Sequence, residues 1–191
     1  MIARIGSAHD PRLAPYAMVA EPAALARAGL FAAEGRLVAP RLLASRYRVH
    51  SILLSDAALD SLRSELETRP DVDLLVAPAA IISATGGFNF HRGCLALGYR
   101  DAPLDVPQLL EASAGSRDPI VVLEGVNNPD NIGGIFRSAH ALGARGVVMG
   151  PGCGDPLYRK AIRTSMGTTL QLAWAGAGDW PDAIGRLRSR G

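Results

Sequence analysis

Short hydrophobic runs alternate with helix-like segments through the first hundred residues of the chain. Three runs are rich in leucine and β-branched residues, as buried strands are: residues 49–54, 73–77 and 94–99. Hydrophobic residues recur at helical spacing in three further segments: residues 22–27, 35–45 and 79–85. Ser55 and Asp56 follow the first run directly, which is typical of a helix N-terminus. The pattern predicts a small α/β sandwich.

The second half of the chain has a more regular pattern, in which each expected strand is followed by an expected helix. The strands are expected at 119–123, 146–149 and 169–174, and the helices at 131–142 and 156–165. Strictly alternating strands and helices predict a parallel sheet with right-handed crossovers. In such sheets ligands bind outside the carboxyl ends of the strands, so the loops after Leu123, Met149 and Trp174 are the candidate site.

The two halves are joined by a stretch rich in Pro, Ala, Ser and Gly, which is typical of linkers. We therefore expect a first domain over residues 1–105, a linker over 106–117 and a second domain over 118–191. The chain ends in a basic amphipathic helix from Asp182 onwards.

Composition is that of an ordinary folded protein, with 48% hydrophobic and 20% charged residues. The formal net charge of +2 is too small to indicate nucleic-acid binding by itself. Of the 20 basic residues 19 are arginine, the better phosphate ligand, although an arginine-favouring genome explains that bias equally well. No stretch approaches the roughly 18 apolar residues of a membrane helix, and the N-terminus lacks an apolar signal core, so we expect a cytoplasmic protein. The scattered cysteines and histidines predict no metal site.

The loop after the first strand of the second domain holds most of the candidate chemistry. Residues 124–134, where a strand passes into a helix, are rich in asparagine, proline and glycine. Asn131 is a suitable N-cap for that helix, and Arg137 follows six residues later. Free backbone N–H groups and the helix dipole favour an anion at such a junction, so a phosphate or a ribose fits there. A plain turn with a helix cap is the structural alternative.

The spacing Asn-Pro-x-Asn-x-Gly-x-x-x-Arg, from Asn128 to Arg137, resembles the first signature motif of the SpoU/TrmH branch of the SPOUT methyltransferases. The resemblance continues through SAHALGARGVVMGPGCGDPLYRKAIRTSMGTTLQLAWA. Upstream, FAAEGRLVAPRLLASRYRVHSILLS and HRGCLALGYR are similar to the ribosomal-protein-like substrate-binding domain of many members. The resemblance implies an α/β fold in which that sandwich precedes a parallel-sheet SPOUT domain. It also implies transfer of a methyl group from S-adenosylmethionine to a ribose 2'-hydroxyl of rRNA or tRNA, with a homodimer in the full-length form.

By the same resemblance, Arg137 takes the role of the catalytic arginine and Asn131 that of the motif asparagine. Since a guanidinium normally stays protonated, we favour Arg137 as a clamp that stabilises the developing oxyanion, while a role as base stays open. The remaining candidates for RNA contact are Asn128, Arg159, Lys160, Arg163 and Ser165 in the second domain, and Arg36 and Arg92 in the first. A solvated helix face is an equal alternative for Arg159, Lys160 and Arg163.

Two later motifs of the family, a Gly-Glu loop and an Ile-Pro segment followed by Ser-Leu-Asn, do not occur in the 191 residues. In the family these segments form the knot that cradles S-adenosylmethionine. We therefore expect the SPOUT domain to be truncated before its knot and the cofactor-binding residues to lie beyond residue 191. Two other functions stay open: an RNA-binding protein without catalysis, and a nucleotide-binding domain that uses the glycines of residues 150–154. The second is weaker, because this glycine pattern lacks the final glycine of the dinucleotide fingerprint.

Overall fold

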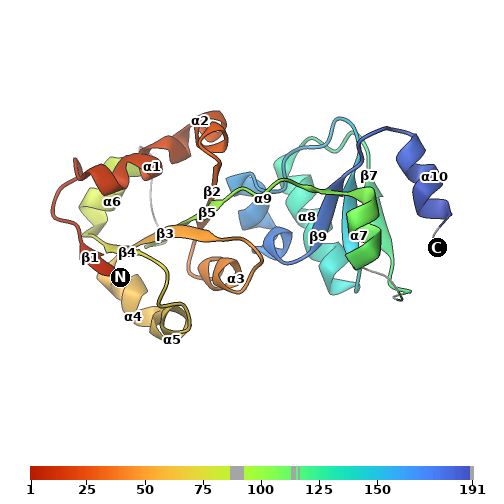
Figure 1. Ribbon diagram of the computed structural model, residues 1–191. Coiled ribbons are helices and arrows are strands. Elements are labelled where there is room, and N and C mark those ends of the chain that lie inside the picture. The colour runs from red at the N-terminus through yellow and green to blue at the C-terminus, as the bar shows by residue number, and fades with distance from the viewer. Residues whose placement is uncertain (87–92, 113–114, 116, 190–191) are drawn as a thin grey trace. The chain divides into compact units, whose positions relative to one another are not determined.

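The computed structural model describes residues 1–86, 93–112, 115 and 117–189, and divides the chain into two compact units (Figure 1). The first unit spans Met1–Asp101 and the second spans Ala102–Gly191. Among the described residues, no helix is long and apolar enough to cross a membrane.

A mixed five-stranded sheet forms the centre of the first unit, in the order β1-β4-β3-β5-β2. Its strands are β1 (Ile2–Arg4), β2 (Leu30–Glu34), β3 (Val49–Leu54), β4 (Leu74–Val76) and β5 (Cys94–Tyr99). Strands β1, β3 and β4 run parallel, and β5 pairs antiparallel with both β3 and β2. The three strands expected from the sequence are confirmed, while β1 and β2 were not foreseen.

Short helices cover both faces of this sheet (Figure 1). One face carries α1 (Ala14–Ala17), α2 (Pro22–Arg27) and α6 (Ala79–Gly86), with the 3-10 turns η1 (Pro11–Leu13) and η2 (Met18–Ala20) beside them. The other face carries α3 (Ala39–Leu43), α4 (Asp56–Ser61) and α5 (Arg63–Glu67). Because successive side chains of a strand point to opposite faces, Leu53 joins the first layer's core while Ile52 and Leu54 lie buried on the other face. The expected α/β sandwich is therefore present.

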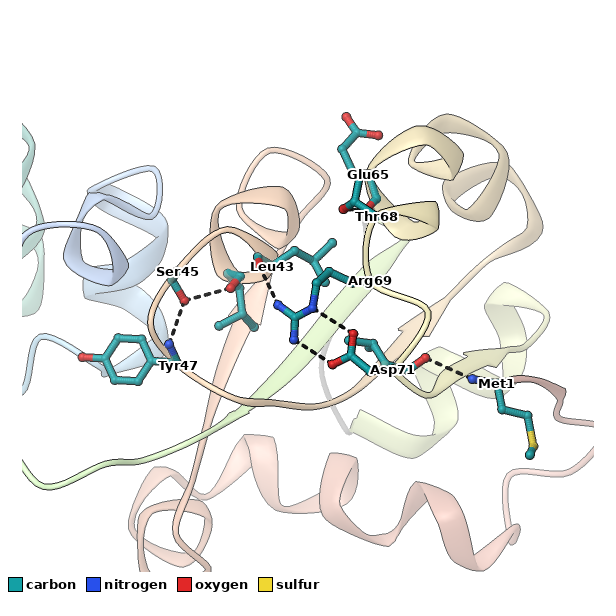
Figure 2. A network of polar contacts seen from close by, with 10 residues as sticks. Met1, Leu43, Ser45, Tyr47, Glu65, Thr68, Arg69 and Asp71 are labelled. Carbon is teal, nitrogen blue, oxygen red and sulfur yellow. Dashed lines mark hydrogen bonds and ion pairs between the residues drawn. The ribbon is translucent and has the colours of Figure 1, made fainter.

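Hydrogen bonds of Arg69 link the end of α3 to the segment that leads into β4 (Figure 2). Its Nη1 donates a hydrogen bond of 2.7 Å to the Leu43 carbonyl. Its Nε and Nη2 donate bonds of 2.9 Å to the two carboxylate oxygens of Asp71. Ser45 stabilises the same helix end, since its hydroxyl donates to the Leu42 carbonyl and accepts from the Tyr47 amide. One guanidinium thus satisfies a helix-end carbonyl and orders the next loop.

The second unit is built on a four-stranded parallel sheet in the order β6-β9-β8-β7. Its strands are β6 (Leu104–Asp105), β7 (Ile120–Leu123), β8 (Gly146–Met149) and β9 (Ala173–Gly176). Helices α7 (Val106–Ala112) and α10 (Asp182–Arg188) share one hydrophobic cluster with Val148 and Ala175. Helices α8 (Pro129–Ala141) and α9 (Arg159–Thr164) lie on the other side of the strands (Figure 1). The parallel pairing of β7, β8 and β9 is that expected from the alternating pattern, while β6 was not foreseen.

Two segments of the second unit differ from the expectation. The stretch 106–117, expected as a linker, contains α7, because Val106, Leu109 and Leu110 bury themselves against β9 and α10. The strand expected over 169–174 begins only at Ala173, because Thr168–Leu170 forms the 3-10 turn η3. The hydroxyl of Thr168 donates to the Ser165 carbonyl at 3.1 Å, which favours the turn over a strand.

Replacing Arg69 tests whether its hydrogen bonds to Leu43 and Asp71 stabilise the first unit. Arg69→Ala leaves the Leu43 carbonyl without its partner, and we expect the free energy of unfolding to fall by about 1–3 kcal/mol. The control Arg63→Ala removes an exposed ion pair with Asp60 and should cost less than about 1 kcal/mol. Urea denaturation followed by circular dichroism measures both; equal losses in the two variants would contradict the role given to Arg69.

Candidate functional site

Backbone hydrogen bonds join the loops that leave the carboxyl ends of β7 and β8. The Gly150 amide donates to the Leu123 carbonyl at 2.7 Å, and the Gly125 amide donates to the Pro151 carbonyl at 2.8 Å. Further along, the Gly154 amide donates to the Val126 carbonyl at 2.8 Å. The loops at the strand tips are therefore one connected layer.

The glycines after β8 have a packing role in this layer. A Cβ atom on Gly150 would lie 2.7 Å from the Leu123 carbonyl oxygen, and one on Gly154 would lie 2.6 Å from the Asn127 carbonyl oxygen. Neither distance is tolerated by a real side chain. The Trp180 indole, which packs against Gly150, donates to the Glu124 carboxylate at 2.8 Å. Close contact between loops accounts for the glycine pattern that the nucleotide-binding alternative had used.

Helix α8 begins at Pro129, the proline of the motif. The N-cap is Asn128, whose side chain accepts a hydrogen bond of 2.8 Å from the Asp130 amide, and Pro129 occupies the first helical position. The interpretation of Asn131 as the N-cap was wrong. Proline is favoured at the first helical position, so the helix starts at Pro129 and its N-cap is the residue before it, Asn128. Asn131 lies within the first turn with its side chain exposed.

Asp130 ties the start of α8 to α9. Its carboxylate lies 2.7 Å from the Lys160 ammonium and accepts a hydrogen bond of 3.0 Å from the Thr164 hydroxyl. The hydrogen bond from Lys160, and then that from Thr164, lowers the pKa of Asp130 below its ordinary value. Sequence reasoning missed Asp130, although an acidic residue in the first turn of a helix is a recognised signal. Lys160, expected to contact RNA, is thereby engaged within the chain.

The same two helices approach closely at Gly133, the glycine of the motif. A Cβ atom there would lie 2.6 Å from the Ala161 carbonyl oxygen and 2.8 Å from the Thr164 Cβ. The contact is therefore between the backbone of α8 and the last turn of α9. Gly134 has nothing within 4 Å of an added Cβ, so the motif needs a glycine at 133 and not at 134.

Ser165 shapes the turn that follows α9. Its side chain is fully buried, and its hydroxyl donates to the Ile162 carbonyl at 2.9 Å and accepts from the Gly167 amide at 3.2 Å. Met166 and Gly167 both have positive φ angles, of 56° and 88°. The hydroxyl of Ser165, a candidate for RNA contact, is thus directed into the protein.

Arg137 projects from the side of α8 that faces α9. It follows Gly133 by four residues and Asp130 by seven, so all three share one stripe of the helix. Its side chain is exposed, and among the described residues it has no hydrogen bond or ion pair. Side chains tilt toward the N-terminus of a helix, so the guanidinium can reach back toward the strand tips. Asn131, six residues earlier, lies about 120° away around the helix.

The remaining sequence candidates have diverse environments. Arg163 is exposed on α9, and its charge helps to lower the pKa of Asp130. Arg159 is half-buried at the start of α9. Arg36 is exposed in the first unit, where its charge opposes the effect of burial that raises the pKa of Cys94 to about 12. Arg92 lies outside the described residues. Among the described residues, no three metal-ligating side chains form a cluster.

Comparison with known proteins gives consistent matches. Residues 118–191 match the model of the SpoU rRNA Methylase family. The chain is 40% identical over 162 residues to an uncharacterized tRNA/rRNA methyltransferase of Mycobacterium tuberculosis, covering 85% of this chain and 54% of that protein. It is 29% identical over 138 residues to the 23S rRNA (guanosine-2'-O-)-methyltransferase RlmB of Xanthomonas axonopodis, covering 69% of this chain and 51% of that protein. The chain thus spans about half the length of these relatives.

Solved structures share the fold. An AdoMet-bound rRNA methyltransferase from Sinorhizobium meliloti superposes with a TM-score of 0.77 at 21% identity, over all of this chain and 70% of that chain. The SpoU methyltransferase AviRb from Streptomyces viridochromogenes, in complex with AdoMet, superposes with a TM-score of 0.76 at 20% identity, over 95% of this chain and 67% of that chain. The fold and the motif are those of the SPOUT superfamily. Within it, the chain belongs to the SpoU/TrmH family of rRNA/tRNA methyltransferases.

A pair of glycine substitutions tests the contact between α8 and α9. Gly133→Ala places a methyl group against backbone atoms, so we expect a loss of about 1–3 kcal/mol in the free energy of unfolding. Gly134→Ala adds the same methyl group in open space and should be neutral, or stabilising by up to about 1 kcal/mol. Both tryptophans lie in the second unit, so chemical denaturation followed by their fluorescence measures the difference. Equal effects of the two substitutions would refute the close approach.

The lowered pKa of Asp130 predicts a pH-dependent contribution to stability. A carboxylate with a depressed pKa in the folded state stabilises that state above its ordinary pKa of about 3.9, and the contribution is lost as the pH falls through the folded value. The difference in unfolding free energy between the wild type and Asp130→Asn should therefore be constant near neutral pH and shrink below about pH 4. Asp182→Asn, an exposed acid at the start of α10, is the control. A difference that does not change down to pH 2 would contradict the ion pair.

Proposed function

We propose that this chain is part of an enzyme that transfers a methyl group from S-adenosylmethionine to a ribose 2'-hydroxyl of rRNA or tRNA. One observation carries the proposal: the motif arginine, Arg137, is exposed and without a partner among the described residues, while Asn128 and Asp130 are engaged in structure. An unpaired guanidinium binds a phosphate or an oxyanion at a lower cost in free energy than a paired one, because no existing ion pair has to be broken. Two relatives, from Streptomyces viridochromogenes and Xanthomonas axonopodis, are 23S rRNA 2'-O-methyltransferases, which supports this class of reaction.

Methylation of a ribose hydroxyl requires that the oxygen be aimed at the methyl carbon and that its developing negative charge be stabilised. Arg137 suits both tasks, since a planar guanidinium binds a phosphate or an oxyanion through two parallel N–H groups. We favour this role over proton abstraction, because a guanidinium remains protonated in proteins. Asn131, on another side of the same helix, would then contact the RNA beside the reacting ribose.

The RNA backbone would pass over the exposed edge of α8 and α9. Arg163 adds a second exposed guanidinium there, and Asn128 marks the N-terminus of α8, where the helix dipole favours phosphate. Arg159 borders the same edge, whereas Lys160 would contribute through its bond to Asp130. The first unit would recognise folded RNA through Arg36 and Arg92. We further propose a cytoplasmic homodimer for the whole protein.

We assign none of the described residues to S-adenosylmethionine. The backbone amides of Gly125, Gly150 and Gly154, in the loops after β7 and β8, already donate to neighbouring loop carbonyls. These three amides are therefore not free to bind the cofactor. The proposal therefore concerns what the chain does to the RNA, and no reaction step is derived through the cofactor.

A methyl-transfer assay on the full gene product tests the proposal. Arg137→Ala should reduce transfer from labelled S-adenosylmethionine to unmodified rRNA or tRNA by at least about 100-fold, because a stabiliser of developing charge is lost. RNA affinity should change by only a few-fold, since one phosphate contact among several is removed. Arg186→Ala, on α10, is the matched control and should retain activity.

The same assay distinguishes a methyltransferase from an RNA-binding protein without catalysis. Transfer by Arg137→Ala at the wild-type rate would refute the assignment of Arg137. RNA binding without any transfer by the wild-type protein would favour the alternative of an RNA-binding member without catalysis.

A further inference from the structure

A pocket of about 400 Å³ opens in the first unit, where β3 and β4 begin and β5 ends. Its walls include His50 and Ser51 at the start of β3, Asp73 before β4, and Tyr99 at the end of β5. The volume lies within the roughly 300–1,000 Å³ typical of small-molecule sites. None of these residues belongs to the motif or to the α8–α9 edge, so the pocket is a separate feature of the chain.

A buried hydrogen-bond chain fixes how His50 presents its ring to the pocket. The fully buried Tyr16 hydroxyl lies 2.7 Å from the Ser51 hydroxyl, which lies 2.8 Å from Nδ1 of His50. Among the described residues, Ser51 is the only hydrogen-bond partner of the Tyr16 hydroxyl. The phenol must therefore donate to Ser51, because the reverse direction would bury its proton without an acceptor. Ser51 then donates to Nδ1, and the ring proton of His50 lies on Nε2.

This arrangement keeps the imidazole neutral and makes Nε2 a fixed donor. Burial lowers the pKa of His50, and the nearby Asp73 carboxylate opposes that shift. Two cations lie at the pocket: Arg12, which is bound in a bidentate pair to Asp10 at 2.9 and 2.7 Å, and the terminal amine of Met1, 3.5 Å from Asp73. Both already have a carboxylate partner, so the pocket suits the base of a nucleotide better than its phosphate.

Asp73 supplies the complementary acceptor. Its carboxylate is about two-thirds exposed and forms an ion pair with the terminal amine of Met1, at 3.5 Å. Exposed pairs of this length are weak and exchange with other partners. The pocket therefore offers one fixed N–H donor and one carboxylate that can accept two parallel hydrogen bonds.

The rings of His50 and Tyr99 line the pocket at the end of β5, with 5.4 Å between their centroids. Beside the pocket, the Arg48 guanidinium lies 4.6 Å from the centre of the Tyr99 ring. Aromatic rings and guanidinium planes are the surfaces on which unstacked RNA bases pack. The polar groups and the flat wall together call for a planar, uncharged ligand with adjacent N–H donors and an acceptor.

We infer that this pocket receives an unpaired guanine base of the RNA substrate. The N1–H and N2–H groups of guanine match the two oxygens of Asp73, and its O6 or N7 accepts from Nε2 of His50. Adenine lacks the adjacent pair of donors, and the pyrimidines offer less surface for packing. The inference rests on the proposed RNA substrate, and it adds a base-reading site distant in sequence from Arg137.

The test is a nuclear magnetic resonance titration of the 191-residue chain with guanosine 5'-monophosphate. The ring signals of His50 and Tyr99 should shift saturably, and the nucleotides of adenine, cytosine and uracil should bind about tenfold more weakly. Asp73→Asn should weaken binding of guanosine monophosphate about tenfold, because the amide replaces one of the two acceptor oxygens by an NH2 donor, which faces an N–H group of the base. Asp60→Asn, an exposed acid on α4, should leave binding unchanged. His50→Phe keeps a ring but removes the donor, and provides a second variant should Asp73→Asn fail to fold.

A second arm identifies the source of the base. An oligouridine with one central guanosine should shift the same signals, whereas oligouridine alone should not. Shifts with the mononucleotide but not with the oligonucleotide would assign a free nucleotide and overturn the RNA proposal. Equal binding of all four nucleotides, full affinity in both variants, or no shift at saturating nucleotide would overturn the pocket itself. If the full gene product transfers no methyl group, the proposed function is contradicted. The shifts measured on the 191-residue chain do not depend on that result.

Discussion

The close contact between α8 and α9 is the constraint on which the candidate site depends. Gly133 brings the backbone of α8 against the Ala161 carbonyl, and Asp130 fixes the same pair of helices through Lys160 and Thr164. A small residue sets the distance and an ion pair sets the register, so α8 has little freedom to slide. Because Arg137 lies on the same stripe as both residues, its position along the edge is fixed by them.

The ten-residue motif combines several structural tasks with one chemical task. Asn128 caps the helix, Pro129 begins it, and Gly133 admits the neighbouring helix. Arg137 and Asn131 extend from this framework as exposed side chains without a side-chain hydrogen bond among the described residues. The positions of Asn128, Pro129 and Gly133 are explained physically, because they serve the packing that presents the arginine.

Much of the fold was predictable, since β3, β4, β5, β7 and β8 are rich in hydrophobic residues and all but β7 are mostly buried. The alanines of β2 give no strand signal, and β2 forms through pairing with β5, which only the tertiary structure provides. The late start of β9 depends on hydroxyl bonds of the turn after α9, and the cap at Asn128 on the choice among three asparagines. Asp130 was missed because its partners lie 30 or more residues away in the sequence. Side-chain partners so distant in sequence leave no local pattern.

The most direct test of this account is the response of the Arg137 guanidinium to RNA. In nuclear magnetic resonance spectra that resolve arginine Nε–H signals, a short single-stranded RNA should shift and broaden the signal of Arg137 and slow its exchange with water, while that of Arg186 on α10 stays unchanged. RNA that binds the chain tightly but leaves the Arg137 signal unmoved would contradict the claim that the α8–α9 contact holds this side chain against a sugar-phosphate.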